Sequence, residues 1–134
     1  MLQDDLPSGA APSPDRSGHI LVVESEKALV RELVSSLRAA GYLVDVAECG
    51  RQALVLAAQT RYSGLILGLS LPDIAGILVY LMLRGIDPEL SRRTVFVSGS
   101  QRGAAPRHEL DGLGLGCLSR PFAIDDLIRR LEAR

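Results

Sequence analysis

Short apolar runs alternate with longer stretches in which apolar residues recur at helical spacing over most of this chain. The runs that predict buried strands are residues 19–23, 43–47, 64–69, 94–97 and 115–119. The stretches that predict helices are residues 25–40, 51–60, 77–84, 107–113 and 124–133. Strands that alternate with helices indicate a parallel sheet with helices on both faces. We therefore expect an α/β doubly wound fold with a five-stranded sheet and five helices.

Several helix ends carry their own signals. Gly41 follows the last periodic residue of the first helix, and Gly85 is expected to end the third helix in the same way. The acids Asp125 and Asp126 fall in the first turn of the last helix, where they complement its dipole. The glycine-rich segment 112–116 overlaps the end of the fourth helix. Since a glycine costs about 1 kcal/mol per helical position, that helix should be short or mobile.

The first 18 residues differ from the rest of the chain. Pro7, Pro12 and Pro14 mix there with serine, glycine, alanine and aspartate without any period, which predicts a linker or disordered tail. We place the folded domain at residues 19–134, the size of one ordinary domain. The start lacks the apolar stretch of a signal peptide, and no apolar run reaches the roughly 18 residues that cross a bilayer. We expect a cytoplasmic protein without a membrane partner.

Composition narrows the choice of partners. The formal net charge is -1, which gives no reason to propose that this domain binds nucleic acid or an anionic membrane. Cys49 and Cys117 belong to no CxxC pair or metal-like cluster, so both are expected to be reduced side chains. Nothing in the composition indicates a cofactor.

Functional sites of such sheets lie at the carboxyl ends of the strands. The segments found there are residues 20–26 (ILVVESE), 65–76 (LILGLSLPDIAG), 95–99 (VFVSG) and 118–122 (LSRPF). Together and in this order they resemble the landmarks of the receiver domain of two-component response regulators. The resemblance covers everything beyond the tail and implies a flavodoxin-like fold.

The resemblance also implies a phosphorylation pocket, and this sequence departs from it. The position of the attacking aspartate is Gly68, and the metal-binding acidic pair is Glu24 and Ser25. Ser98 keeps the hydroxyl position, whereas the lysine position is Arg120. Glycine supplies no nucleophile. A single remaining carboxylate is too little charge to hold Mg²⁺, which dehydrates reluctantly. The sequence therefore predicts neither phosphorylation nor a metal site.

Other residues are poor substitutes for the missing nucleophile. Asp73 lies past Pro72 and should point away from the strand end, and Ser70 lacks a base. His19 and His108 are not placed for catalysis. An engineered glycine at position 68 would not explain the changes at the serine and arginine positions as well.

Further expectations concern the strand that ends at Ser119. With the aspartate and the metal gone, Arg120 should pair with Glu24 across the pocket, unless either charge is simply solvated. The bond between Arg120 and Pro121 is expected to be cis, as receivers usually have it. Cys117 stands where receivers often carry a switch aromatic, so an aromatic swing cannot operate here.

The third helix is apolar nearly throughout. Ile77, Val79, Tyr80 and Leu83 can supply its inward stripe. Leu78, Leu81 and Met82 sit at i, i+3 and i+4 and would form an outward apolar patch, where typical receivers are polar. Such a patch usually marks a contact surface, although a rotated helix would leave it partly covered.

These observations favour a pseudo-receiver: a protein-interaction module in two-component signal transduction that works without phosphorylation and is not an enzyme. Its expected partner is a protein: a histidine kinase, another domain of a parent protein, or a second copy. Residues 6–9 (LPSG) and the linker after them resemble the junction that follows the ATP-binding domain of a hybrid histidine kinase. Two alternatives remain: a receiver that takes phosphate on a non-standard residue, and a small-ligand-binding α/β domain. The latter lacks a GxGxxG loop after its first strand.

Overall fold

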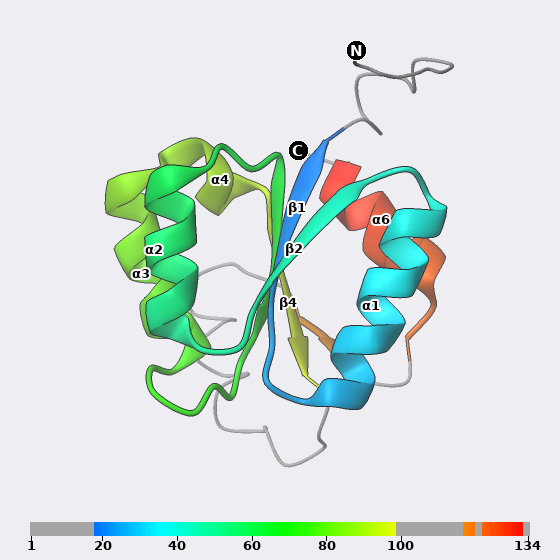
Figure 1. Ribbon diagram of the computed structural model, residues 1–134, viewed down its shortest axis with the longest axis horizontal. Helices are drawn as coiled ribbons and strands as arrows, with labels where there is room; N and C mark the ends of the chain where they lie inside the picture. The colour runs from blue at the N-terminus through cyan, green and yellow to red at the C-terminus, as the bar shows by residue number, and fades with distance from the viewer. Residues whose placement is uncertain (1–17, 99–116, 120–121, 133–134) are drawn as a thin grey trace.

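The computed structural model describes residues 18–98, 117–119 and 122–132 (Figure 1). The strands are β1 (His19–Val23), β2 (Leu43–Ala47), β3 (Gly64–Gly68), β4 (Thr94–Ser98) and β5 (Cys117–Ser119). The helices are α1 (Lys27–Ala39), α2 (Gly50–Gln59), α3 (Gly76–Ile86), α4 (Pro88–Arg92) and α6 (Ile124–Glu132). Four of the helices and all five strands correspond to predicted elements, with ends that differ by a few residues.

The five strands form one parallel sheet in the order β2-β1-β3-β4-β5. The strand order reverses next to β1, which has β2 on one side and β3 on the other, and this confirms the doubly wound fold. In the register, Val23 lies opposite Ala47 and Leu67, and Gly68 lies opposite Val97. The carboxyl ends of β1, β3 and β4 therefore meet at one edge of the sheet.

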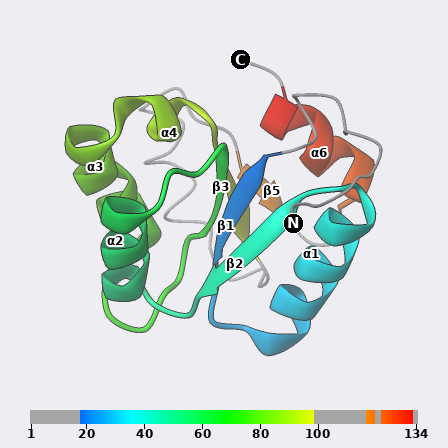
Figure 2. The same cartoon turned by 45° about the horizontal axis from the view of Figure 1, so that its top comes forward.

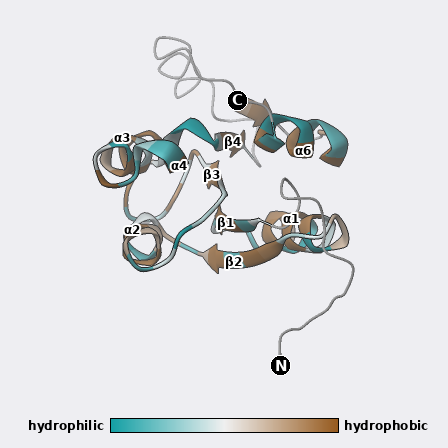
Figure 3. Cartoon of the chain, turned by 90° about the horizontal axis from the view of Figure 1, so that it is seen from above, coloured by the Kyte–Doolittle hydropathy of each residue, from teal (hydrophilic) through white to brown (hydrophobic). Residues whose placement is uncertain are grey.

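Two apolar clusters form the core, one on each face of the sheet. Along β1, Leu21 and Val23 belong to one cluster, whereas Ile20 and Val22 belong to the other. Helices α2, α3 and α4 cover the first face, and α1 and α6 cover the second (Figures 1 and 2). Seen from above, the hydrophobic strands lie between these two helical layers (Figure 3). All five residues of β3 are buried, as expected for a central parallel strand.

The region after β3 corrects two expectations. Helix α3 does not end at Gly85 but continues to Ile86, and the amide of Asp87 still donates a helical hydrogen bond to the carbonyl oxygen of Leu83. The short helix α4 was not predicted. Asp87 is its N-cap and accepts a hydrogen bond from the Leu90 amide at 3.1 Å, and Pro88 occupies the first turn.

Other expectations fall outside the described residues. These are the tail before Gly18, the predicted fourth helix at 107–113, the glycine-rich segment 112–116 and the first residues of the predicted fifth strand.

The amino-terminal end of α3 approaches the end of β3 unusually closely. The amide of Gly76 donates to the carbonyl oxygen of Leu69 at 3.0 Å. A Cβ atom at Gly76 would lie 3.0 Å from the carbonyl carbon of Gly68 and would come closer to that carbonyl oxygen than real Cβ atoms do. The obstacle is backbone, so it cannot rotate away. Glycine at this position is what allows α3 to pack against the end of β3.

We expect Gly76→Ala to lower the free energy of unfolding by about 2 kcal/mol or more, since overpacking against fixed atoms costs roughly 1–3 kcal/mol. The control is Gly85→Ala in the same helix, where an added Cβ has no neighbour within 4 Å. That change should stabilise the protein by about 0.5–1 kcal/mol through helix propensity. Urea unfolding of both variants measures the difference. Equal effects of the two changes would contradict the close approach at Gly76.

Candidate functional site

The pocket implied by the sequence lies where β1 and β3 end, and the buried carboxylate of Glu24 lies in it. This side chain follows β1 directly and is only 5% exposed. Its Oε2 accepts hydrogen bonds from the amides of Ser25 and Glu26, both at 3.0 Å. Its own amide donates to the carbonyl oxygen of Ala47 at the end of β2. The carboxylate is thus held by the backbone that leads into α1.

Gly68, the last residue of β3, is buried beside this carboxylate. A Cβ atom at position 68 would lie 3.1 Å from Cδ of Glu24 and 3.2 Å from the carbonyl oxygen of Val23. It would come still closer to Oε1 of Glu24, below the distance that real Cβ atoms keep. The Glu24 carboxylate therefore occupies the space in which any side chain at position 68 would begin. Sequence reasoning noted the missing nucleophile but not that a neighbour fills its place.

The other pocket positions are less constrained. Ser25 is exposed, and Ser98 at the end of β4 is partly buried. Cys117, at the start of β5, is also partly buried and packs against the core cluster of α2 and α3. Arg120 lies outside the described residues, and so do its predicted pairing with Glu24 and its bond to Pro121.

The residues at this edge do not fit a magnesium site. Mg²⁺ requires oxygen ligands in near-octahedral geometry and usually at least one well-placed carboxylate. Glu24 is the carboxylate at the ends of β1 and β3, and one of its oxygens already accepts two amide hydrogen bonds. Ser25 is neutral and Gly68 has no side chain. Within residues 18–98, 117–119 and 122–132, no group of three His, Cys, Asp or Glu side chains could hold a metal ion.

Asp73 has a structural role that sequence reasoning did not predict. Its Oδ1 accepts hydrogen bonds from the amides of Gly50 and Ile74, each at 2.8 Å, and its Oδ2 accepts from Arg51 at 2.9 Å. The carboxylate therefore caps the amino terminus of α2 from a loop 22 to 23 residues away and points away from the pocket, as expected. The Arg51 hydrogen bond, followed by those from Gly50 and Ile74, lowers the pKa of Asp73 to about 2.

The outer face of α3 is apolar. Leu78 is 52% exposed, Leu81 37% and Met82 50%, so all three side chains of the predicted patch face solvent. Ile86, one turn beyond Met82, is also 50% exposed, and it extends the patch. Ile86 is not part of the predicted patch, because Gly85 is expected to end the helix before it. We call these four residues the α3 patch.

The inward face of α3 has the predicted composition. Val79, Tyr80 and Leu83 are buried, and Ile77 is partly buried. The helix is therefore seated as the periodicity indicated, and rotation does not cover the α3 patch.

Comparison with known proteins agrees with this arrangement. The family model described as "Response regulator receiver domain" matches residues 20–132. The uncharacterized transcriptional regulatory protein YkoG of Bacillus subtilis is 33% identical over 119 residues, which are 87% of this chain and 50% of that protein. The transcriptional regulatory protein CusR of Escherichia coli is 32% identical over 116 residues, 84% of this chain and 49% of its own. This chain thus spans about half the length of these curated relatives.

Among solved structures, a sensor protein from Polaromonas sp. JS666 is similar in both sequence and fold. It is 27% identical with a TM-score of 0.71, and the match covers 90% of this chain and 94% of that one. No helix in the described part of this chain has the length and hydrophobicity of a membrane span.

We expect Asp73→Asn to lower thermal stability at neutral pH, because asparagine keeps only one acceptor oxygen for the three amides. A folded-state pKa of about 2, below the ordinary 3.8, stabilises the fold above about pH 4, and this contribution is lost as the pH falls through about 2. The difference in melting temperature between the natural protein and Asp73→Asn should therefore shrink as the pH falls from about 4 to about 2. Thermal unfolding at a series of pH values measures it.

Glu48→Gln is the matched control for this experiment. Glu48 is exposed and lies just before α2, so its substitution removes the same charge near the same helix terminus. Its substitution should produce no comparable loss at neutral pH. A gap for Asp73→Asn that persists unchanged down to about pH 2 would mean that the cap does not depend on the ionised carboxylate.

Proposed function

This chain is a member of the response regulator receiver domain family, and we propose that it acts there as a pseudo-receiver, a protein-interaction module whose conformation does not depend on phosphorylation. One observation carries the proposal: the Glu24 carboxylate occupies the space in which a side chain at position 68 would begin. A receiver that accepts a phosphoryl group needs a nucleophile at this strand end and room for the incoming group. Gly68 provides no nucleophile, and the Glu24 side chain would have to move before this strand end could accommodate one.

Glu24 is itself a poor replacement for the nucleophile. Its side chain is buried, and Oε2 already accepts two backbone hydrogen bonds that attack on phosphorus would weaken. The neutral Ser25 and the side-chain-free Gly68 also leave no metal to offset the charge of a phosphoryl donor. We therefore infer that the domain performs no phosphoryl chemistry and is not an enzyme.

A receiver that is not phosphorylated can still act by binding another protein. The α3 patch is a suitable surface for such binding. Leu78, Leu81, Met82 and Ile86 are contiguous over two turns of one helix, and each is exposed by more than a third. Contiguous exposed apolar side chains mark interaction sites in folded proteins. We propose that this patch contacts a second copy of the domain or another domain of the same signalling protein.

The surrounding protein is also a matter of proposal. Because the curated relatives are about twice as long as this chain, we propose that the domain acts as part of a larger cytoplasmic signalling protein. The Polaromonas relative is described as a sensor protein. From the likeness of residues 6–9 to a kinase junction, we propose that this domain belongs to a hybrid histidine kinase. Two relatives are described as transcriptional regulatory proteins. We propose that this domain makes no nucleic-acid contact itself, whatever its neighbours bind.

We expect no phosphorylation when the chain is incubated with acetyl phosphate and Mg²⁺. Intact-mass spectrometry should show the unmodified mass. Gly68→Asp alone should not restore the reaction, because the new side chain meets the Glu24 carboxylate and Ser25 still supplies no charge for the metal.

A receiver that retains its aspartate, treated in parallel, shows that the phosphodonor is active. A mass gain of one phosphoryl group on the natural chain would overturn the proposal and favour the alternative of a non-standard acceptor. Peptide mapping would then identify the modified residue.

The double substitution Leu81→Glu with Met82→Lys tests the α3 patch. We expect weaker self-association or weaker binding to the parent protein, because charges replace apolar contact surface without changing the net charge. The stability of the isolated domain should change by no more than about 0.5 kcal/mol, as usual for surface sites. Solution mass by light scattering and thermal unfolding provide the two measurements.

Leu43→Lys is the control, because Leu43 is also exposed but begins the edge strand β2 rather than lying on α3. It should leave association unchanged. If the double variant unfolds while association is unaffected, the two side chains belong to the core and the interface proposal fails.

A further inference from the structure

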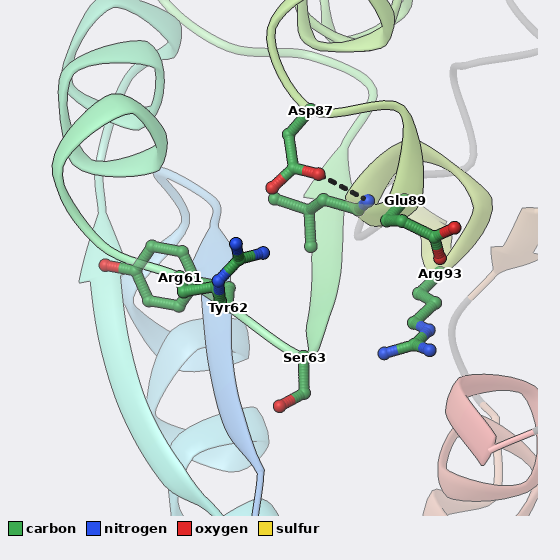
Figure 4. A pocket seen from close by; sticks show the side chains of 7 residues that line it. Arg61, Tyr62, Ser63, Asp87, Glu89 and Arg93 are labelled. Carbon is green, nitrogen blue, oxygen red and sulfur yellow. Dashed lines mark hydrogen bonds between the residues drawn. The ribbon is translucent and has the colours of Figure 1, made fainter.

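A pocket of about 280 Å³ lies at the opposite edge of the sheet, where the strands begin (Figure 4). Arg61 and Ser63, which precede β3, line it from one side, and Arg93, which precedes β4, lines it from the other. The side chain of Leu90 contributes an apolar part of the wall. Gly68 lies at the carboxyl end of β3, so this pocket is separate from the site around Gly68.

Arg93 brings an unsatisfied donor to this pocket. Its Nε is buried, and no described residue accepts a hydrogen bond from it. Its backbone is fixed at the same time: the amide donates to the carbonyl oxygen of Leu90 at 2.9 Å, and the carbonyl oxygen accepts from Leu65 at 3.0 Å. A buried donor on a charged group is costly to leave unpaired. An anion in the pocket need not reach Nε itself, because it would offset the charge of the whole guanidinium, which lines the pocket.

Arg61 and Ser63 line the same space and carry further donors. The guanidinium groups of Arg61 and Arg93 lie on opposite sides of it, with the Ser63 side chain at its lower end (Figure 4). The Ser63 Oγ accepts a hydrogen bond from the His19 amide at 3.1 Å, which leaves the hydroxyl proton to donate.

Tyr62 does not join this set. Its ring points away from Arg61 and Arg93 (Figure 4), and its hydroxyl donates to Asp45 at 2.7 Å. Burial and the Asp45 carboxylate raise the pKa of Tyr62 to about 12, so it stays a neutral donor to that partner.

The two acids of the pocket already have partners. Asp87 accepts from the Leu90 amide at 3.1 Å as the cap of α4, and Glu89 pairs with Arg92 at 2.7 Å. The Glu89–Arg92 pair is neutral as a whole, so the two lining arginines, Arg61 and Arg93, remain against the single carboxylate of Asp87. This leaves a net positive charge for an anion. The carboxylates would still repel a polyanion, so they restrict the pocket to small ligands.

We propose that this pocket binds a small molecule through a phosphoryl or carboxylate oxyanion held by Arg61, Ser63 and Arg93. Planar guanidinium groups bind both kinds of oxyanion through paired hydrogen bonds. The volume lies just below the roughly 300 Å³ at which ligand pockets begin, so the ligand is the size of a small metabolite. The proposal goes beyond protein interaction: it gives the domain a chemical input in place of phosphorylation.

The test is a titration of the ¹⁵N-labelled chain with inorganic phosphate and, separately, with succinate, each against sodium chloride at equal ionic strength. We expect saturable chemical-shift changes at the amides of Arg61, Ser63 and Arg93 with at least one of the two anions. The anion that binds more tightly identifies the phosphoryl or the carboxylate class.

Arg61→Gln and Arg93→Gln should each weaken this binding about tenfold or more, the loss expected for a charge-assisted hydrogen bond. Arg61 is exposed, so its variant should fold even if the half-buried Arg93 variant does not. Arg92→Gln is the matched control: it removes the same charge nearby but does not line the pocket. No saturable response to either anion, or equal weakening in Arg61→Gln and Arg92→Gln, would overturn the proposal.

Discussion

The close packing around the carboxyl end of β3 is the constraint on which this edge of the molecule depends. Gly76 lets α3 begin directly against the Gly68 carbonyl, and Gly68 in turn leaves room for the Glu24 carboxylate from β1. The ends of β1 and β3 and the start of α3 thus meet at one point, and the latter two contribute glycines there. A larger residue at Gly76 would force α3 outward, and the apolar cluster beneath it would loosen, whereas a larger residue at Gly68 would displace the Glu24 side chain from the amides it binds.

Two acids near this edge bind backbone amides. Glu24 holds two amides at the start of the segment that leads into α1, and Asp73 holds three amides around the start of α2. Both carboxylates therefore satisfy donors that helix starts and tight loops leave unpaired. In a receiver that binds Mg²⁺, the charge at the strand ends is kept for the ion. In this domain Glu24 binds backbone amides instead, an arrangement that fits the proposed pseudo-receiver.

Much of the fold could be predicted from the sequence because it depends on local periodicity. The buried runs indicated the parallel sheet, and the helical spacing placed both faces of α3. The end of α3 could not be predicted from Gly85, because one glycine costs a helix only about 1 kcal/mol, and the hydrogen bond from the Asp87 amide to the Leu83 carbonyl oxygen continues the helix past it. The short α4 did have a signal, the Asp87-Pro88 pair, which is typical of a helix start.

The site was predictable only in its residue types. That Gly68 lacks a nucleophile follows from the sequence, but that Glu24 fills its place depends on the spacing of two neighbouring strand ends. The Asp73 cap joins segments far apart in the chain, so no local pattern encodes it. Its presence has a dynamic consequence. The amides of Gly50 and Ile74 share one oxygen of a single side chain, so a movement of the Asp73 carboxylate weakens both hydrogen bonds at once. This one side chain therefore links the mobility of the loop after β3 to that of the first turn of α2.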